Sequence, residues 1–127
     1  MNAPTLDRQE LQYVLTLTNL GIKRHVAKAA VYLIKAGYAT SREIEIGADL
    51  RQPEVSIAMK ELKSLGWVSE KEVKKKGKGR PLKGYSVNVN FNQIISWLEH
   101  ERTRVCEERR TDIERLKDLV KVFGVNY

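Results

Sequence analysis

The segment that decides the fold reads TSREIEIGADLRQPEVSIAMKELKSLGWVSEKEVKKKGKGRPLKGY and runs from Thr40 to Tyr85. Its first four residues, Thr40-Ser41-Arg42-Glu43, have the spacing of an N-terminal capping box. A second helix is expected to begin at Gln52-Pro53-Glu54, because the missing N–H of proline costs no hydrogen bond in a first helical turn. Gly66 is expected to end it. The segment therefore predicts a short helix, a turn and a second helix.

Two strand-like runs follow the second helix and flank a basic loop. Trp67–Lys74 and Tyr85–Val89 alternate between apolar and polar residues, which is typical of paired strands. The loop Lys74–Lys83 holds two glycines and a proline, which disfavour regular structure. From Lys71 to Lys83 there are seven basic residues and a single acid, Glu72. We call this basic hairpin the wing.

Helices are also expected before and after this segment. Apolar residues at helical spacing predict helices over Asp7–Gly21 and Lys23–Ala36. Asn92–Phe123 has the same spacing and no glycine or proline, which predicts a helix of up to ~48 Å. The expected fold class is mainly α with a small β-hairpin. Residues 1–90 would form a winged helix-turn-helix DNA-binding domain, and residues 91–127 a C-terminal dimerisation helix.

The second helix of the segment has two different faces. At ~100° per residue one side is apolar and is expected to be buried. That side consists of Val55, Ala58, Met59, Leu62 and Leu65. The opposite side is polar and basic, and it consists of Ser56, Ile57, Lys60 and Ser64, with Gln52 and Lys63 at its edges. A polar, basic helix face after a tight turn favours contact with duplex DNA.

Composition and charge agree with a nucleic-acid partner. The 127-residue chain has a formal net charge of +7 and a pI of about 9.6, which favours a polyanion. The single cysteine, Cys106, excludes a disulfide within the chain. The N-terminal residues lack the pattern of a signal peptide, and no apolar run approaches the ~20 residues that span a bilayer. We therefore expect a cytoplasmic protein with no membrane partner.

The first 90 residues resemble two families of transcriptional regulators. The N-terminal winged-helix domain of TrmB-type regulators is similar at Leu20-Gly21, Ala27, Tyr32-Leu33, Gly37, Thr40, Glu43-Ile44, Val55, Leu62 and Gly66-Trp67-Val68. The recognition helix of ArsR-type repressors is similar at Gln52-Pro53-Glu54-Val55-Ser56, with Leu62 and Gly66. The resemblance covers about Thr5–Val89 and implies a winged helix-turn-helix transcriptional regulator.

The resemblance further implies a homodimer on double-stranded DNA. Its recognition helix would enter the major groove, and the wing would lie on the minor groove or the flanking backbone. The residues expected to contact DNA are Gln52, Ser56, Ile57, Lys60 and Lys63 on the helix, and Lys74, Lys75, Lys76, Lys78, Arg80 and Lys83 in the wing. Lys78-Gly79-Arg80-Pro81 also resembles the core of an AT-hook, in which arginine enters a narrow A·T-rich minor groove. Each assignment has an ordinary alternative, such as a helix cap at Gln52, solubilising charge at Lys60 and a solvated hairpin tip.

No metal, cofactor or effector follows from the sequence. The chain has no room for the sugar-binding domain of typical TrmB proteins, and it lacks the cysteine cluster of metal-sensing ArsR repressors. Cys106, His100 and His25 have no zinc-ligand spacing, and His25 is expected to be a polar residue on a helix face. No phosphate-binding glycine loop or nucleophile elbow occurs, so we expect no enzymatic activity.

The long C-terminal helix is expected to form the dimer interface, because a core of this size cannot cover it. Its distal apolar residues have the four-three spacing of a coiled-coil seam. The residues expected at the interface are Leu98, Val105, Ile113, Leu116, Val120 and Phe123. Arg102 and Arg109 interrupt the stripe, which argues against a long, regular coiled coil. The alternative is that the helix folds back on its own domain.

Three functions are compatible with these features. The first is a sequence-specific regulator that binds duplex DNA as a dimer. The second is an architectural protein that binds DNA through charge with little sequence preference. The third is a winged-helix module that binds acidic protein partners. The polar face of the second helix disfavours the third, because protein-binding faces more often present apolar anchors.

Overall fold

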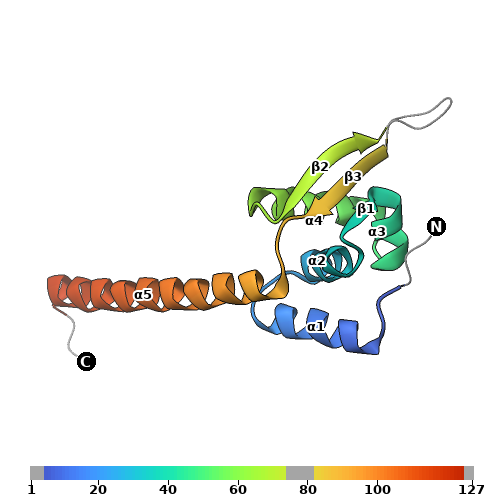
Figure 1. Ribbon diagram of the computed structural model, residues 1–127. Helices are drawn as coiled ribbons and strands as arrows, with labels where there is room; N and C mark the ends of the chain where they lie inside the picture. Colours follow the sequence, from blue (N-terminus) through green and yellow to red (C-terminus); the bar gives the residue numbers. More distant parts are fainter. Residues whose placement is uncertain (1–4, 74–81, 125–127) are drawn as a thin grey trace. The chain divides into compact units, whose positions relative to one another are not determined.

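The computed structural model describes residues 5–73 and 82–124 (Figure 1). In chain order the described elements are α1 (Arg8–Asn19), α2 (Arg24–Ala36), β1 (Tyr38–Thr40), α3 (Ser41–Gly47), α4 (Gln52–Ser64), β2 (Val68–Val73), β3 (Leu82–Val87) and α5 (Phe91–Phe123). The chain divides into two compact units, residues 1–91 and 92–127. The first unit holds α1 to α4 and the sheet, and the second holds α5 from its second residue onward.

Helix α2 is the centre of the first unit. It packs against both α1 and α4 and lies between them (Figure 1). Every residue from Val26 to Leu33 is buried, as expected for a helix that neighbours cover on several sides. Gly37 ends the helix at φ 80°, a left-handed conformation that glycine adopts without strain. The predicted helix at Lys23–Ala36 is confirmed.

Helix α1 begins with the predicted capping box. The side chain of Asp7 accepts a hydrogen bond from the N–H of Glu10 at 2.8 Å, and the N–H of Asp7 donates to the carboxylate of Glu10 at 2.8 Å. The same carboxylate lies 2.9 Å from the ammonium group of Lys35 on α2. Val14 and Leu17 are buried. The ion pair and the apolar contacts together hold α1 against α2.

A contact between a tyrosine and a glycine joins α2 to α3. The side chain of Tyr32 is fully buried, and a Cβ atom at Gly47 would overlap its ring. Because Gly47 has no side chain, the end of α3 can approach α2 this closely. The carbonyl of Gly47 also accepts a hydrogen bond from the N–H of Leu6 at 3.2 Å. Gly47 therefore fixes the first helix of the helix-turn-helix segment to the core.

The sheet has the strand order β1-β3-β2, with both pairs antiparallel. Strands β2 and β3 form the predicted hairpin, with Glu70 opposite Tyr85. Strand β1, which pairs with β3, was not predicted, because three residues are too few to show an alternating pattern.

Strand β3 corrects one sequence-based boundary. It begins at Leu82 rather than at Tyr85, so Lys83 lies in the strand and not in the loop. Gly84 interrupts the alternation that would have revealed this start. It is buried, and a Cβ atom there would meet the side chain of Tyr38 on the neighbouring strand. The close approach of two strands thus explains a glycine that the sequence pattern treats as part of a loop.

Helices α3 and α4 form the predicted helix-turn-helix. The N–H of Glu43 donates to the hydroxyl of Thr40 at 3.2 Å, and the N–H of Thr40 donates to the carboxylate of Glu43 at 2.9 Å. Ile44, one residue further on, is fully buried. With the hairpin that follows α4, these helices confirm the expected winged helix-turn-helix fold in a mainly helical chain.

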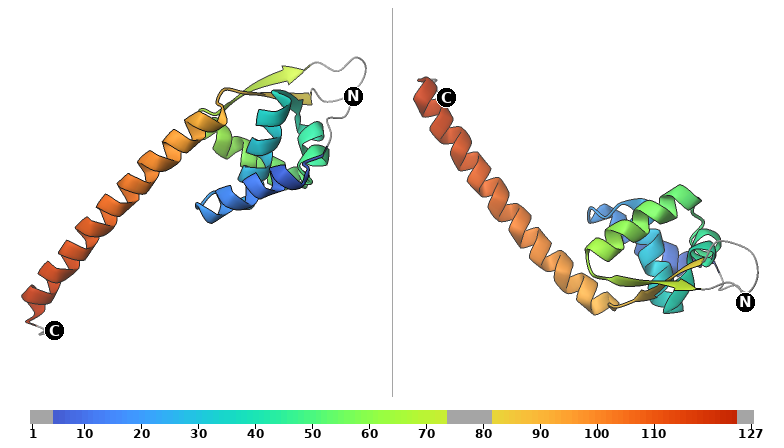
Figure 2. Two further views of the ribbon diagram at one scale, coloured as in Figure 1. Left: turned by 60° about the horizontal axis from the view of Figure 1, so that its bottom comes forward. Right: turned by 90° about the horizontal axis from the view of Figure 1, so that it is seen from above.

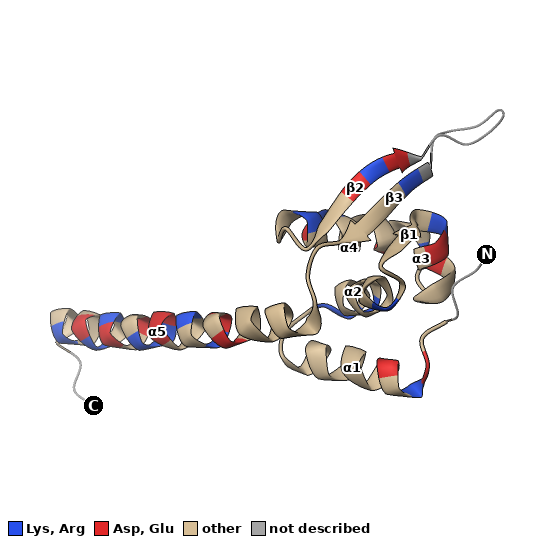
Figure 3. Cartoon of the chain, in the orientation of Figure 1, with Lys and Arg blue, Asp and Glu red and all other residues tan. Residues whose placement is uncertain are grey.

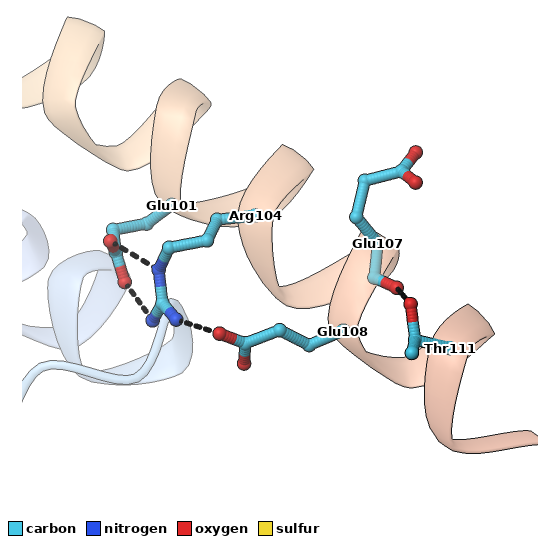
Figure 4. A network of polar contacts seen from close by, with 5 residues as sticks. All are labelled: Glu101, Arg104, Glu107, Glu108 and Thr111. Carbon is cyan, nitrogen blue, oxygen red and sulfur yellow. Dashed lines mark hydrogen bonds and ion pairs between the residues drawn. The ribbon is translucent and has the colours of Figure 1, made fainter. Parts of the chain in front are cut away.

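Helix α5 is a single unbroken helix (Figures 1 and 2). Its 33 residues correspond to a length of about 50 Å at ~1.5 Å per residue, which agrees with the predicted long helix. Its surface carries ion pairs between neighbouring turns, in which Arg104 lies between Glu101 and Glu108 (Figure 4). The Thr111 hydroxyl also donates to the Glu107 carbonyl at 3.0 Å. Ion pairs between residues three or four positions apart stabilise a helix by ~0.2–0.5 kcal/mol each.

The contact between Tyr32 and Gly47 generates a stability prediction. Gly47→Ala should destabilise the protein by about 1–3 kcal/mol, because the new methyl group would overlap the fully buried Tyr32 ring. Urea denaturation of the wild type and the variant measures this difference. A double-mutant cycle with Tyr32→Leu provides the control, since a smaller side chain at position 32 should relieve part of the clash. Additive effects of the two changes would contradict the contact.

Candidate nucleic-acid interface

Helix α4 separates its apolar and polar residues as predicted. Val55, Ala58, Met59 and Leu62 are buried in the first unit. The opposite, outward face is exposed, and it consists of Gln52, Ser56, Ile57, Lys60, Lys63 and Ser64. Ile57 is 55% exposed and is a large apolar side chain within this otherwise polar face.

One residue of the predicted apolar stripe, Leu65, is not buried as expected. Leu65 is half-buried, and it is the C-cap of α4 rather than a residue of its last turn. Leu65 keeps helical backbone angles, with φ −75° and ψ −11°, but the chain turns at the next residue, Gly66, where φ is 78°, so no further helical turn follows it. The buried stripe of α4 therefore ends at Leu62.

The turn before α4 is held by a buried lysine. Asp49 adopts a left-handed conformation with φ 53°, and the N–H of Leu50 donates to the carbonyl of Glu45 at 3.0 Å, as in a Schellman turn. Lys28 of α2 is only 6% exposed, and its ammonium group donates to the carbonyl of Asp49 at 3.4 Å. The central helix thus contacts the turn that sets the direction of α4.

The two acids of α4 lie away from the outward face. At ~100° per residue, Glu54 and Glu61 occupy the flank opposite Lys63. The carboxylate of Glu54 accepts a hydrogen bond from the N–H of Arg51 at 2.9 Å, which lowers the pKa of Glu54. The carboxylate of Glu61 lies 3.9 Å from the ammonium group of Lys23. The outward face therefore keeps a polar, basic character next to an acidic flank.

The strands of the wing carry charge of both signs. Glu70, Lys71 and Glu72 alternate along β2, and Lys83 is exposed on β3 (Figure 3). The other wing residues proposed to contact DNA lie outside the described residues; they are Lys74, Lys75, Lys76, Lys78 and Arg80.

A carboxylate links the end of α4 to the wing. The ammonium group of Lys63 donates to one carboxylate oxygen of Glu70 at 3.1 Å, and the ammonium group of Lys83 lies 4.0 Å from the same oxygen. We call Lys63, Glu70 and Lys83 the Glu70 bridge. It brings together two residues that the sequence assigned to separate DNA contacts, one on the helix and one in the wing.

The ionisation of Glu70 follows from its neighbours. The hydrogen bond from Lys63 is the main cause that lowers the pKa of Glu70, and Lys83 and Tyr85 act in the same direction. Burial, and then the charge of Glu70, raises the pKa of Tyr85 to about 12. Near neutral pH, Glu70 is therefore a carboxylate and Tyr85 a neutral phenol that donates to it.

The sequence analysis missed Glu70 as a functional residue. Lys63 and Glu70 are seven positions apart, and Lys83 reaches Glu70 only because β3 pairs with β2. No periodicity within one element brings these three side chains together. An acid immediately before the strongly basic segment Lys71–Lys83 is the only signal that the sequence offers.

The described residues show no metal site and no membrane span. No group of three or more His, Cys, Asp or Glu side chains in them could hold a metal ion. None of the described helices is both long and apolar enough to cross a bilayer. His25, expected on a polar helix face, is half-buried in α2.

The apolar residues of α5 that were assigned to a dimer interface share one side of the helix. Ile113, Leu116 and Phe123 are 54%, 62% and 76% exposed. Leu98, Val105 and Val120 are of intermediate exposure. Leu119, which the sequence analysis left out, is 52% exposed and lies beside Leu116 at ~100° per residue. The role of this stripe in a dimer stays a prediction.

Comparison with solved structures identifies the fold. TrmBL2, described as an archaeal chromatin protein with a novel mode of DNA binding, matches with a TM-score of 0.68 and 18% identity, over 91% of this chain and 43% of that one. This chain thus spans less than half the length of TrmBL2. A possible transcriptional regulator from Methanosarcina mazei matches with a TM-score of 0.60 and 12% identity, over 91% of this chain and 98% of that one.

A third structure is more distant. A MarR-family transcriptional regulator from Silicibacter pomeroyi matches with a TM-score of 0.51 and 17% identity, over 89% of this chain and 80% of that one. None of these three structures is described as an ArsR-type repressor. No family model matches the chain, and no curated protein matches its sequence. At these identities the likeness concerns the fold, and the chain has the winged helix-turn-helix fold of these proteins.

Proposed function

We propose that the protein is a dimeric transcriptional regulator that binds specific sequences of double-stranded DNA. Helix α4 acts as the recognition helix in the major groove, and the wing contacts the minor groove or the adjacent backbone. The protein binds DNA in the cytoplasm and catalyses no reaction. Two α4 helices in a dimer would read two half-sites of one operator.

The observation that carries this proposal is the exposed face of α4. A helix that buries Val55 and Leu62 while presenting Ser56 and Lys60 suits the major groove, which admits an α-helix and displays hydrogen-bonding groups of every base pair. The placement of Lys63 on α4 and Lys83 on β3 near the same Glu70 oxygen also supports this function, because it brings cations of the helix and of the wing close together. The compared structures include a possible transcriptional regulator and a MarR-family transcriptional regulator, which is consistent with it.

An architectural role in DNA packaging is the second candidate. The net charge of +7 supports it, because backbone charge alone produces affinity without sequence preference. The likeness to TrmBL2, which is described as a chromatin protein, gives a further reason to test it.

Selection from a random-duplex library separates the two candidates. A regulator should enrich one sequence with two-fold symmetry, whereas an architectural protein should bind without enrichment. Each selected duplex is then compared with a scrambled duplex of equal composition at one salt concentration, because affinities at different salt concentrations are not comparable. Absence of binding to any duplex would refute both candidates.

If α4 lies in the major groove, alanine substitutions on its exposed face should reduce base preference. Gln52→Ala or Lys60→Ala should reduce discrimination between the selected and a scrambled duplex, since each good base contact contributes ~1–3 kcal/mol. Binding to the scrambled duplex should change much less. Lys117→Ala on α5 is the control for the loss of one exposed lysine. If the variants weaken both duplexes equally, these side chains contact phosphates instead of bases.

The α5 stripe predicts the assembly state. Leu116→Glu with Val120→Glu would place like charges in the seam between two copies, and should yield a folded monomer that binds a half-site weakly. The wild-type dimer should select half-sites ~34 Å apart, or a multiple of that spacing. Light scattering measures the mass of both proteins. Val122→Glu, on another side of the same helix, should leave the mass unchanged. A double variant that still has twice the mass of the chain would place the interface elsewhere.

A further inference from the structure

The Glu70 bridge has a consequence for the strength of DNA binding. Its two lysines belong to the surface that would face DNA, and both are substantially exposed, with side-chain exposures of 40% for Lys63 and 59% for Lys83. Glu70, on β2, is less exposed, at 27%. The cluster therefore presents two cations that share one anion.

A DNA phosphate and the Glu70 carboxylate compete for the same ammonium groups. Lysine contributes to DNA binding by releasing counterions condensed on the phosphates, and a lysine already neutralised by a carboxylate releases fewer. The carboxylate would also repel an approaching phosphate, because both are anions at close range. Surface ion pairs of this kind add little to folding stability, so the fold does not depend on this bridge.

We propose that Glu70 limits the affinity of the protein for DNA by holding Lys63 and Lys83 in competition with backbone phosphates. This inference rests on the proposed DNA-binding function. It assigns to Glu70 a role opposite to that of its basic neighbours, although Glu70 lies within the same surface. Because the competition is for phosphates, Glu70 lowers affinity for every duplex in similar proportion and leaves base preference unchanged.

The variant Glu70→Gln tests the inference. The amide has the shape of the carboxylate and its oxygen still accepts from the Tyr85 hydroxyl, but it no longer neutralises the two lysines. The equilibrium constant is measured by fluorescence anisotropy as a function of salt concentration, on the selected and on a scrambled duplex. We expect affinity at low salt to rise on the order of tenfold, and the salt slope to steepen by roughly one to two. Affinity for the selected and for the scrambled duplex should rise by the same factor.

Two controls isolate the bridge. Glu114→Gln removes the same charge from a pair with Lys117 on α5, at a distance of 3.4 Å, and should leave the slope unchanged. Adding Lys63→Gln and Lys83→Gln to Glu70→Gln should abolish the gain, because the released cations are then absent. Circular dichroism and the thermal unfolding midpoint establish that each variant is folded. If Glu70→Gln does not fold, Glu70→Ser, which also removes the charge, replaces it in the same measurements.

The outcomes distinguish this inference from the proposed function. A wild-type protein that binds no duplex refutes the proposed function. A wild type that binds, with an unchanged slope in Glu70→Gln, refutes the inference alone. Weaker binding by Glu70→Gln also overturns it, since Glu70 would then orient the lysines toward DNA. An equal gain in Glu114→Gln would show that net charge, and not the bridge, limits affinity.

Discussion

The burial of α2 is the constraint on which the rest of the first unit depends. A helix with a buried run from Val26 to Leu33 must be covered by neighbours, and α1, α3, α4 and the sheet supply that cover. Each neighbour buries one apolar side and leaves its other side to solvent. The polar face of α4 is exposed because Val55 and Leu62 on its other side are committed to the core.

Two local features turn this packing into a defined orientation of α4. Gly47 lets the end of α3 lie against the Tyr32 ring, and the left-handed conformation at Asp49 reverses the chain within a short turn. Lys28 extends the influence of α2 to that turn through its contact with the Asp49 carbonyl. A candidate DNA-reading face thus takes its direction from residues that would never touch DNA.

The candidate interface carries both acidic and basic side chains, and they occupy separate positions on it. The acids of α4 lie on one flank, and Glu70 lies between Lys63 on the other flank and Lys83 on β3. A uniformly basic surface would bind any polyanion strongly, which favours packaging more than selection. As proposed, Glu70 among these cations would weaken binding to the DNA backbone, while the face of α4 that is proposed to read bases stays exposed.

The sequence by itself determined the helices, the N-terminal caps of α1 and α3 and the two faces of α4. Capping boxes and helical periodicity are local, so residues within one turn, such as Thr40 and Glu43, reveal them. The tertiary structure alone decided strand β1, the early start of β3 and the end of the apolar stripe before Leu65. It also decided the Glu70 bridge, since Lys63 and Lys83 meet Glu70 only after α4 packs on β2 and β3 pairs beside it. Contacts between distant segments depend on how elements pack together, and no periodic pattern within one element records that.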